Sequence, residues 1–450
     1  MRLSHALPLL LLVLELPLIL NAGYFAHDEL VWFARADVAS WSSLPWTQWF
    51  DLKPLLYRPL TSNLWLALSY VAQTSPHAMH FVFVAFGIAN AWMLTRALAA
   101  RGIAERTAAG AALVFTLSPY AIYVSGWVAT LGDLLTLAFG LLAARATQRS
   151  VVEPNIRTAS IAAIGSALLV ALALLSKESA IVLPALLLLV APPPISYRRL
   201  AYAIAPSALV VAIYLALRLP VLSASAAISP AYAWSFAHIP ERFAEFLLYP
   251  FMPPLFEISA TLAKSASRLF AAALCVVALL IALGSANRRA PIVWLVACAA
   301  ALAPVLVLAT SYNQYGYLAS AVAVATVAAV WNEASRTARA TCRVLAAIAI
   351  IHGFIVMAPF LLIGKVQRNL YADLVTALAD SPEPVRIVAT DARDAWLPAR
   401  LLEDVDTWRG TRIAGRVHFA ADAPVSGADR LLFMNRDGHL QPDASPLTPD

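Results

Sequence analysis

The sequence predicts an all-α polytopic membrane protein with about 11 transmembrane helices, followed by a small C-terminal α/β module. Of its 450 residues, 61% are hydrophobic and 13% are charged, whereas a soluble domain has about 45–50% apolar and about 25% charged residues. The apolar residues form long continuous runs, and arginines gather in the short loops between them. This composition excludes a soluble enzyme, a disordered chain and a nucleic-acid-binding protein.

The apolar runs all lie within residues 1–364. Each run has roughly 17–25 residues and is therefore long enough to cross a bilayer. We interpret the first run as a retained span and not as a signal peptide, because no small-residue cleavage site precedes Tyr24 and more spans follow. In order along the chain, the predicted spans are 6–25, 77–99, 108–126, 128–145, 159–176, 179–194, 201–217, 268–284, 291–309, 317–331 and 344–364.

The distribution of charge in the loops gives an orientation. The net charge is +6, and every short loop assigned to the inside contains two or three arginines, whereas the short outside loops contain at most one cation. This asymmetry is the positive-inside pattern and not a polyanion-binding surface. It predicts a cytoplasmic N-terminus. The excess of Arg over Lys and the absence of an Asn-x-Ser/Thr sequon favour a bacterial inner membrane, with the C-terminal module in the periplasm.

Three longer segments are predicted on the outside: the loops 26–75 and 218–267, and the polar residues 365–450. Within the second loop, Pro240–Pro250 has the pattern of an amphipathic helix lying on the membrane. The last segment contains alternating stretches that predict short strands, and it ends in a tail that we expect to be disordered. These stretches are Val385–Ala389, Arg412–Phe419 and Arg430–Met434, and the tail is Gln441–Asp450.

Ionisable and aromatic side chains from distant parts of the chain fall at the outside ends of the spans. Charge next to a span is expensive and is therefore a candidate for function. The candidate site residues are Asp28, Glu29, Tyr57, Arg58, His80, Asp133, Lys177, Gln314, Tyr315 and Tyr317.

A structural role competes at most of these positions. The acidic pair 28–29 fits a solvated loop start, and Arg58 fits an interfacial anchor. Asp133 could form a structural hydrogen bond to a neighbouring helix, and Lys177 could pair with Glu178 as a loop cap. His80 could be a helix histidine whose hydrogen bonds are satisfied. The two tyrosines at 315 and 317 fit an interfacial aromatic belt.

This mixture of acids and cations suits one reaction type, the transfer of a sugar from a lipid phosphate to a hydroxyl group. A carboxylate would act as general base on the acceptor, and cations would stabilise the departing phosphate. Attack opposite the leaving group inverts the sugar carbon, as in inverting glycoside hydrolysis. The inside loops are too short for a nucleotide-binding domain, and no glycine-rich phosphate loop, nucleophile elbow or metal-ligand cluster is present. The sequence therefore indicates no particular cofactor, and it leaves a divalent metal open without any residue pattern that supports one.

Several motifs resemble a known family. The segment Tyr57-Arg58-Pro59-Leu60-Thr61, with Leu68-Ser69-Tyr70 and Pro76–His80 after it, is similar to the "YRPL…NY…P…FH" stretch of the transmembrane-and-tetratricopeptide protein O-mannosyltransferases. The other similarities are Leu175-Ser176-Lys177-Glu178 with Val182-Leu183-Pro184, Trp127–Leu135, Tyr315–Ser320, and the acidic pair Asp28-Glu29 that is typical of the wider GT-C glycosyltransferase superfamily. The resemblance covers roughly residues 20–320.

The resemblance implies a GT-C-like fold and an inverting hexosyltransferase that uses a polyprenyl-phosphate sugar, with mannose as the expected sugar type. It implies that Asp28 is the general base with Glu29 beside it, and that Arg58 and Lys177 face the donor phosphate. The acceptor would be a hydroxyl of a protein or glycolipid on the extracytoplasmic face.

The sequence departs from the family at three points. Gln314 stands where the family has an arginine, Leu131 or Gly132 replaces the arginine before Asp133, and the helical repeats are absent. Two alternatives therefore stay open: a lipid-glycan transporter or flippase, and a catalytically silent scaffold with the same fold. A transporter would place ionisable groups near the bilayer midplane, often within internal repeats, whereas the charges here gather at one face.

Overall fold

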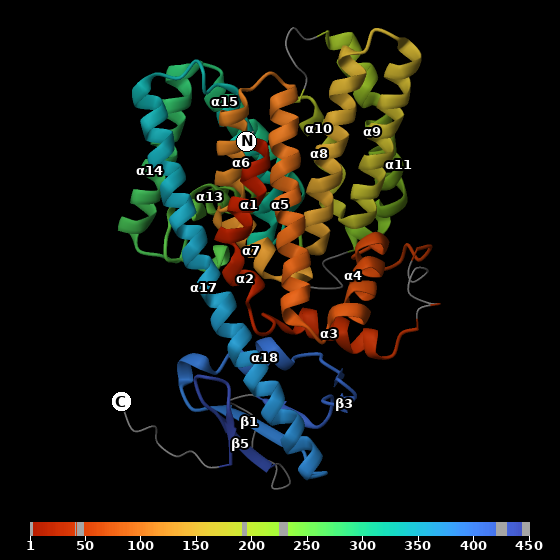
Figure 1. Cartoon of the computed structure of the whole chain (residues 1–450), viewed down its shortest axis with the longest axis vertical. Coiled ribbons are helices and arrows are strands. Elements are labelled where there is room, and N and C mark those ends of the chain that lie inside the picture. The colour runs from red at the N-terminus through yellow and green to blue at the C-terminus, as the bar shows by residue number, and fades with distance from the viewer. Residues whose placement is uncertain are drawn as a thin grey trace.

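The computed structural model is a helical bundle with a small β-sheet at one end (Figure 1). It describes residues 3–40, 42, 49–190, 196–224, 233–419 and 430–442. The predicted tail from residue 443 onward, and parts of the two predicted outside loops, lie outside these ranges.

Six helices of the described residues are long and apolar enough to cross a membrane. They are α5 (Pro76–Ala100), α8 (Leu131–Val152) with the 3-10 turn η2 (Val128–Thr130) before it, α9 (Ile156–Ser176), α11 (Tyr197–Ser223), α14 (Ala266–Ala286) and α17 (Arg336–Asp380). A seventh span is possible by composition if α6 (Glu105–Thr116) and α7 (Pro119–Gly126), which meet at a bend of 61°, are taken together. The structure therefore agrees with a polytopic membrane protein.

The remaining predicted spans correspond to short or broken helices. The first divides at Glu15 into α1 (Leu3–Leu14) and α2 (Leu16–Ile19), where Pro17 opens the second helix. The others are the turn η3 (Glu178–Val182) with α10 (Leu183–Leu187), α15 (Ala290–Leu306) and α16 (Gly316–Ala329). A continuous helix of about 20 residues is needed to cross the hydrocarbon core. None of these helices reaches that length alone.

The bundle also contains helices at its sheet-bearing end. The segment predicted as the first outside loop forms α3 (His27–Asp37) and α4 (Pro59–Ala72). The predicted amphipathic segment forms α13 (Ile239–Leu248), flanked by the turns η5 (Phe236–His238) and η6 (Tyr249–Phe251). Two further turns are η7 (Ile258–Ala260) and η8 (Asn313–Tyr315).

Helix α17 joins the bundle to the sheet without a break (Figure 1). It has 45 residues, so the predicted boundary between 364 and 365 falls inside one helix. Its apolar stretch continues past 364 into a stripe that packs on the C-terminal segment, with Leu370, Tyr371 and Leu374 fully buried. The backbone therefore has no linker at the predicted domain boundary.

The C-terminal segment contains a four-stranded sheet in the order β4-β1-β5-β6. Strand β1 (Val385–Ala389) pairs in parallel with β4 (Val417–Phe419) and β5 (Arg430–Met434), and β6 (Leu440–Gln441) pairs antiparallel with β5. A turn η9 (Ala392–Asp394) and helix α18 (Leu397–Leu402) follow β1, and β2 (Thr407–Trp408) pairs with β3 (Thr411–Arg412) as a separate hairpin.

Two details of the strand prediction were wrong. The expected continuous strand 412–419 divides, because the chain turns at Gly415, whose φ of +71° lies in the left-handed region. The expected disordered tail begins too early, because Gln441 pairs with Phe433 in the sheet.

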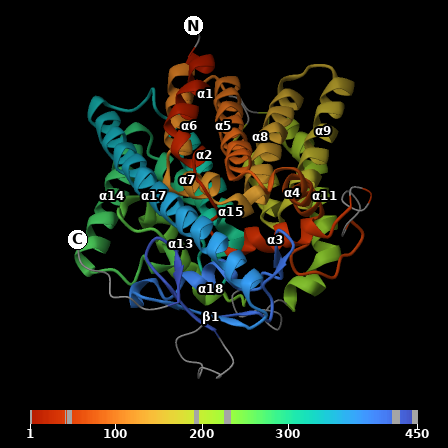
Figure 2. The same ribbon diagram turned by 60° about the horizontal axis from the view of Figure 1, so that its bottom comes forward.

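The sheet-bearing segment packs on α3, as the second view shows beside α18 (Figure 2). Trp408 of β2 contacts Tyr24, Phe33 and Tyr371, at ring-centroid distances of 6.4, 6.2 and 4.9 Å. The Arg400 guanidinium of α18 lies 3.9 Å from the centroid of the Phe25 ring, and it also meets Glu257 at 3.2 Å. The ring contacts of Trp408 make the C-terminal segment part of the same core as α3.

Candidate functional site

A polar cavity of about 640 Å³ lies where α3, the start of α4, the start of α8 and the turn η8 meet the C-terminal segment. Six of the residues singled out from the sequence line this cavity. They are Asp28, Arg58, Asp133, Lys177, Gln314 and Tyr315. They come from five segments that are far apart in the chain, so the fold itself brings them together.

Four of the predicted residues do not line this cavity. Glu29 points into the core, and Tyr57 donates to the Trp49 carbonyl at 2.8 Å. The His80 Nε2 meets the Gly23 carbonyl at 2.9 Å, and the Tyr317 hydroxyl accepts from Asn90 Nδ2 at 3.1 Å. His80 and Tyr317 are buried within helices, and the His80 Nδ1 is buried without a hydrogen-bond partner among the described residues.

The segment before α4 delivers Arg58 to the cavity. Pro59 begins α4 because its ring fixes a helical φ and its missing N–H would have no partner in the first turn. The buried Arg218 of α11 donates to the carbonyls of Leu52, Pro54 and Leu55 and thereby holds the approaching backbone. Arg58 is thus positioned from both sides, by a helix start and by a buried guanidinium.

The ammonium of Lys177 forms a buried ion pair with Asp133. Nζ lies 2.6 Å from each carboxylate oxygen, and the two side chains are 4% and 10% exposed. The same ammonium lies 4.9 Å from the centroid of the Tyr315 ring. Gly132 permits this approach of α8 to the end of α9, because a Cβ there would lie 3.0 Å from the Ser176 carbonyl oxygen.

A second pair joins Arg58 to Glu178 in a two-point contact, with Nε at 2.7 Å from Oε2 and a further bond to Oε1. Burial opposes ionisation of Glu178, but the neighbouring guanidinium outweighs it and lowers the pKa of Glu178 to about 2. Glu178 is therefore a carboxylate at neutral pH. Arg58 and Lys177 are each held in place by a carboxylate, which fixes their geometry before any ligand arrives.

Glu29 has a different environment from its neighbour Asp28. Its Oε2 accepts from the backbone N–H groups of Phe25 and Ala26 at 2.6 and 3.0 Å, and its Oε1 accepts from that of Val128 at 3.0 Å. Burial raises the pKa of Glu29 to about 8, although these three donors lower it. Such a pKa suits a general base. However, both carboxylate oxygens accept backbone hydrogen bonds inside the core, so Glu29 cannot reach a substrate proton in the cavity.

We expect Glu29→Ala to lower the free energy of unfolding by about 3 kcal/mol or more, because it leaves three buried N–H groups without their acceptor. Thermal unfolding in detergent would measure the change. The matched control is Asp28→Ala, which removes a half-exposed side chain one residue away. Equal melting temperatures for the two variants would contradict the structural role of Glu29.

The cavity also contains charged residues that the sequence analysis missed. His27 and Arg35 come from α3, and Asp404 and Asp406 come from the C-terminal segment. His27 precedes the acidic pair directly, so its position in the sequence was a usable signal. No signal pointed to the two C-terminal aspartates, because that segment was expected to form a separate module.

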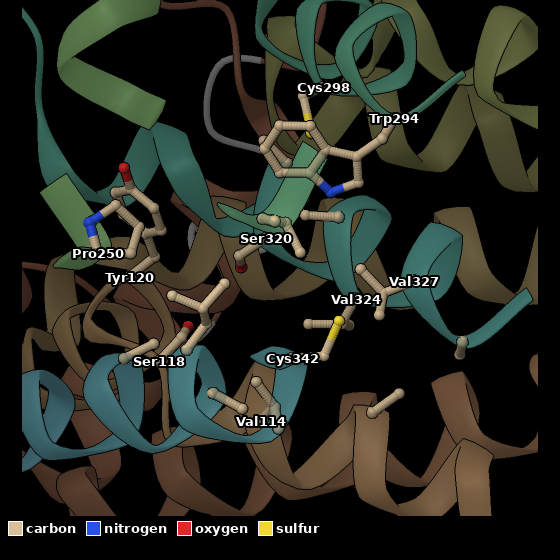
Figure 3. Close-up of a pocket in the computed structure, with 18 of the residues that line it drawn as sticks. Val114, Ser118, Tyr120, Pro250, Trp294, Cys298, Ser320, Val324, Val327 and Cys342 are labelled. Atoms are coloured by element: carbon tan, nitrogen blue, oxygen red, sulfur yellow. The ribbon is translucent and has the colours of Figure 1, made fainter. Parts of the chain in front are cut away.

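Two apolar cavities lie between the helices of the bundle. One of about 490 Å³ lies among α6, α13, α15, α16 and α17, and Figure 3 shows its mostly carbon lining, with the hydroxyls of Ser118, Tyr120 and Ser320 among its few polar groups. The other, of about 310 Å³, is lined by α5, α8, α10, α15 and α16. A small void lined by Asp133, Tyr315 and Leu318 lies between the polar cavity and this second apolar cavity.

Across the described part of the chain, no group of three or more His, Cys, Asp or Glu side chains has a geometry that could hold a metal ion. The cavity contains Arg58 and Lys177, each paired with a carboxylate, and it is also lined by Asp28, Asp404 and Asp406. No protein-family model, curated protein or solved structure matches this chain.

Proposed function

We propose that the protein is an inverting glycosyltransferase that moves a sugar, a mannose-like hexose, from a polyprenyl-phosphate donor to an acceptor hydroxyl. The observation that carries the proposal is the meeting of Asp28, Arg58 and Lys177 in one polar cavity at an end of an apolar helical bundle. Such a site keeps a lipid in the bilayer and its head group beside polar side chains. The acceptor is a protein or a glycolipid.

In this proposal Asp28 is the general base. Its carboxylate takes the proton of the acceptor hydroxyl while the acceptor oxygen attacks the sugar carbon. The bond from that carbon to the phosphate oxygen breaks, and its electron pair leaves with the polyprenyl phosphate, which gains one negative charge. Arg58 and Lys177 stabilise that charge, while Glu178 and Asp133 hold them in position. Displacement from the side opposite the leaving group inverts the configuration at the sugar carbon.

The membrane arrangement in this proposal has 11 spans, with the short and broken helices α1–α2, α10, α15 and α16 completing those that are long enough alone. The positive-inside pattern places the N-terminus in the cytoplasm and the cavity and C-terminal segment on the periplasmic side of a bacterial inner membrane. The apolar cavity between α8 and α16, which the small void separates from Asp133, is the place for the first isoprene units of the donor.

The test is transfer by the purified protein in lipid nanodiscs, with radiolabelled polyprenyl-phosphate mannose and glucose and a mixture of periplasmic acceptors. We expect label in an acceptor together with released polyprenyl phosphate. Arg58→Gln should lose transfer, and Arg157→Gln, at an exposed position outside the cavity, should retain it. Label that crosses the bilayer of vesicles without transfer would favour a flippase instead.

A further inference from the structure

A histidine next to the proposed base has both of its ring nitrogens engaged. The His27 Nδ1 lies 3.2 Å from the Arg400 carbonyl oxygen, and its Nε2 lies 3.3 Å from Asp28 Oδ1. A carbonyl oxygen only accepts hydrogen bonds, so Nδ1 must carry a hydrogen. In the neutral ring this leaves the Nε2 lone pair facing the carboxylate.

This lone pair lies 3.3 Å from Asp28 Oδ1, so a proton that Asp28 takes up can pass directly to Nε2. His27 is therefore the next carrier for a proton that leaves Asp28. The His27 side chain is 28% exposed and that of Asp28 is 51% exposed, so the ring also has a route to water.

The C-terminal segment holds this histidine in place. The Arg400 side chain donates to the Phe25 carbonyl at 3.3 Å and meets Glu257 at 3.2 Å, which fixes α18 against the start of α3. Three more charged groups, Arg35, Asp404 and Asp406, line the same cavity, and Glu29 follows Asp28 in α3.

We propose that His27 is a positioning and proton-relay residue for Asp28, with its tautomer set by the C-terminal segment. The inference rests on the proposed function. In the relay, Asp28 accepts the hydroxyl proton of the acceptor and passes it to Nε2, and the imidazolium then releases it to water. The carboxylate and the neutral ring are both restored, and the overall reaction releases one proton.

Three variants separate the two roles of the histidine. His27→Ala removes both and should lower kcat on the order of 100-fold, the scale of a misplaced or unassisted catalytic base. Added imidazole should restore much of the rate and shift the acidic limb of the pH profile. In His27→Gln the amide can still donate to the Arg400 carbonyl but cannot take up a proton from Asp28, so kcat should stay low. His77→Ala is the matched control, because its ring lies outside the cavity, where Nδ1 is 3.1 Å from the Ile19 carbonyl oxygen.

Full activity in His27→Gln would overturn the relay, and full activity in His27→Ala would overturn both roles. A second measurement does not depend on transfer: nitrogen NMR of histidine-labelled protein in nanodiscs. It should show the Nδ1–H form of His27 and a titration that changes in Asp28→Asn. A wild-type protein that transfers no sugar but shows this coupled titration would contradict the proposed function and leave the pairing of His27 with Asp28 standing. An Nε2–H form of His27 would contradict that pairing.

Discussion

Asp28→Asn should abolish sugar transfer while the protein keeps its stability. An amide cannot accept the hydroxyl proton, and general-base assistance contributes about 10²- to 10⁴-fold to rate. The side chain is half exposed and lies in the first turn of α3, so the change in free energy of unfolding should stay below about 1 kcal/mol. Single-turnover transfer and thermal unfolding, measured on the same preparation, would give both quantities.

The matched control is Asp51→Asn, which changes an exposed aspartate outside the cavity. It should leave both the rate and the melting temperature unchanged. If Asp28→Asn transferred sugar at the wild-type rate, the assignment of the base would be wrong. If both variants lost activity together, the assay would be reporting a general effect of charge and not the chemistry of Asp28.

The buried pair of Lys177 and Asp133 should show a large loss that a second substitution reverses. Lys177→Met leaves the Asp133 carboxylate desolvated without its cation, and breaking such a pair costs about 3–5 kcal/mol of stability. The double variant Lys177→Met with Asp133→Leu replaces both charges by apolar groups and should recover most of that loss. Transfer should stay absent in the double variant, because the cation proposed for the phosphate is missing.

A double-mutant cycle of unfolding free energies would measure the coupling between the two side chains. The exposed pair Lys365 and Asp437, whose side chains are 52% and 58% exposed, is the matched control. Its removal should change stability by less than about 1 kcal/mol. A wild-type melting temperature for Lys177→Met would show that Asp133 does not depend on this cation.

The helical nature of the chain could be predicted from the sequence because the apolar runs are long and the breaks between them are charged. The number of spans was harder, because composition does not show where a helix stops. Pro17 restarts the first helix after Glu15, and Leu117–Ser118 separates α6 from α7 at a sharp bend. The length of α17 was also missed, because its last third alternates charge with a buried stripe.

The gathering of Asp28, Arg58, Asp133 and Lys177 was predicted from their places at the ends of spans, and the structure brings them into one cavity. Their individual environments could not be predicted. Adjacent residues of α3 point in different directions, so Asp28 faces the cavity and Glu29 faces the core. The close approach of α8 to the end of α9 was equally hidden, because it depends on Gly132, where a Cβ would lie 3.0 Å from the Ser176 carbonyl oxygen.

The unbroken helix α17 has one more implication. At 1.5 Å per residue its 45 residues extend about 68 Å, more than twice the roughly 30 Å of a hydrocarbon core. A rod of that length extends well past the apolar part of the bundle and carries the segment that contains Asp404 and Asp406. Because that segment also packs on α3, the helix ties one wall of the polar cavity to the apolar bundle.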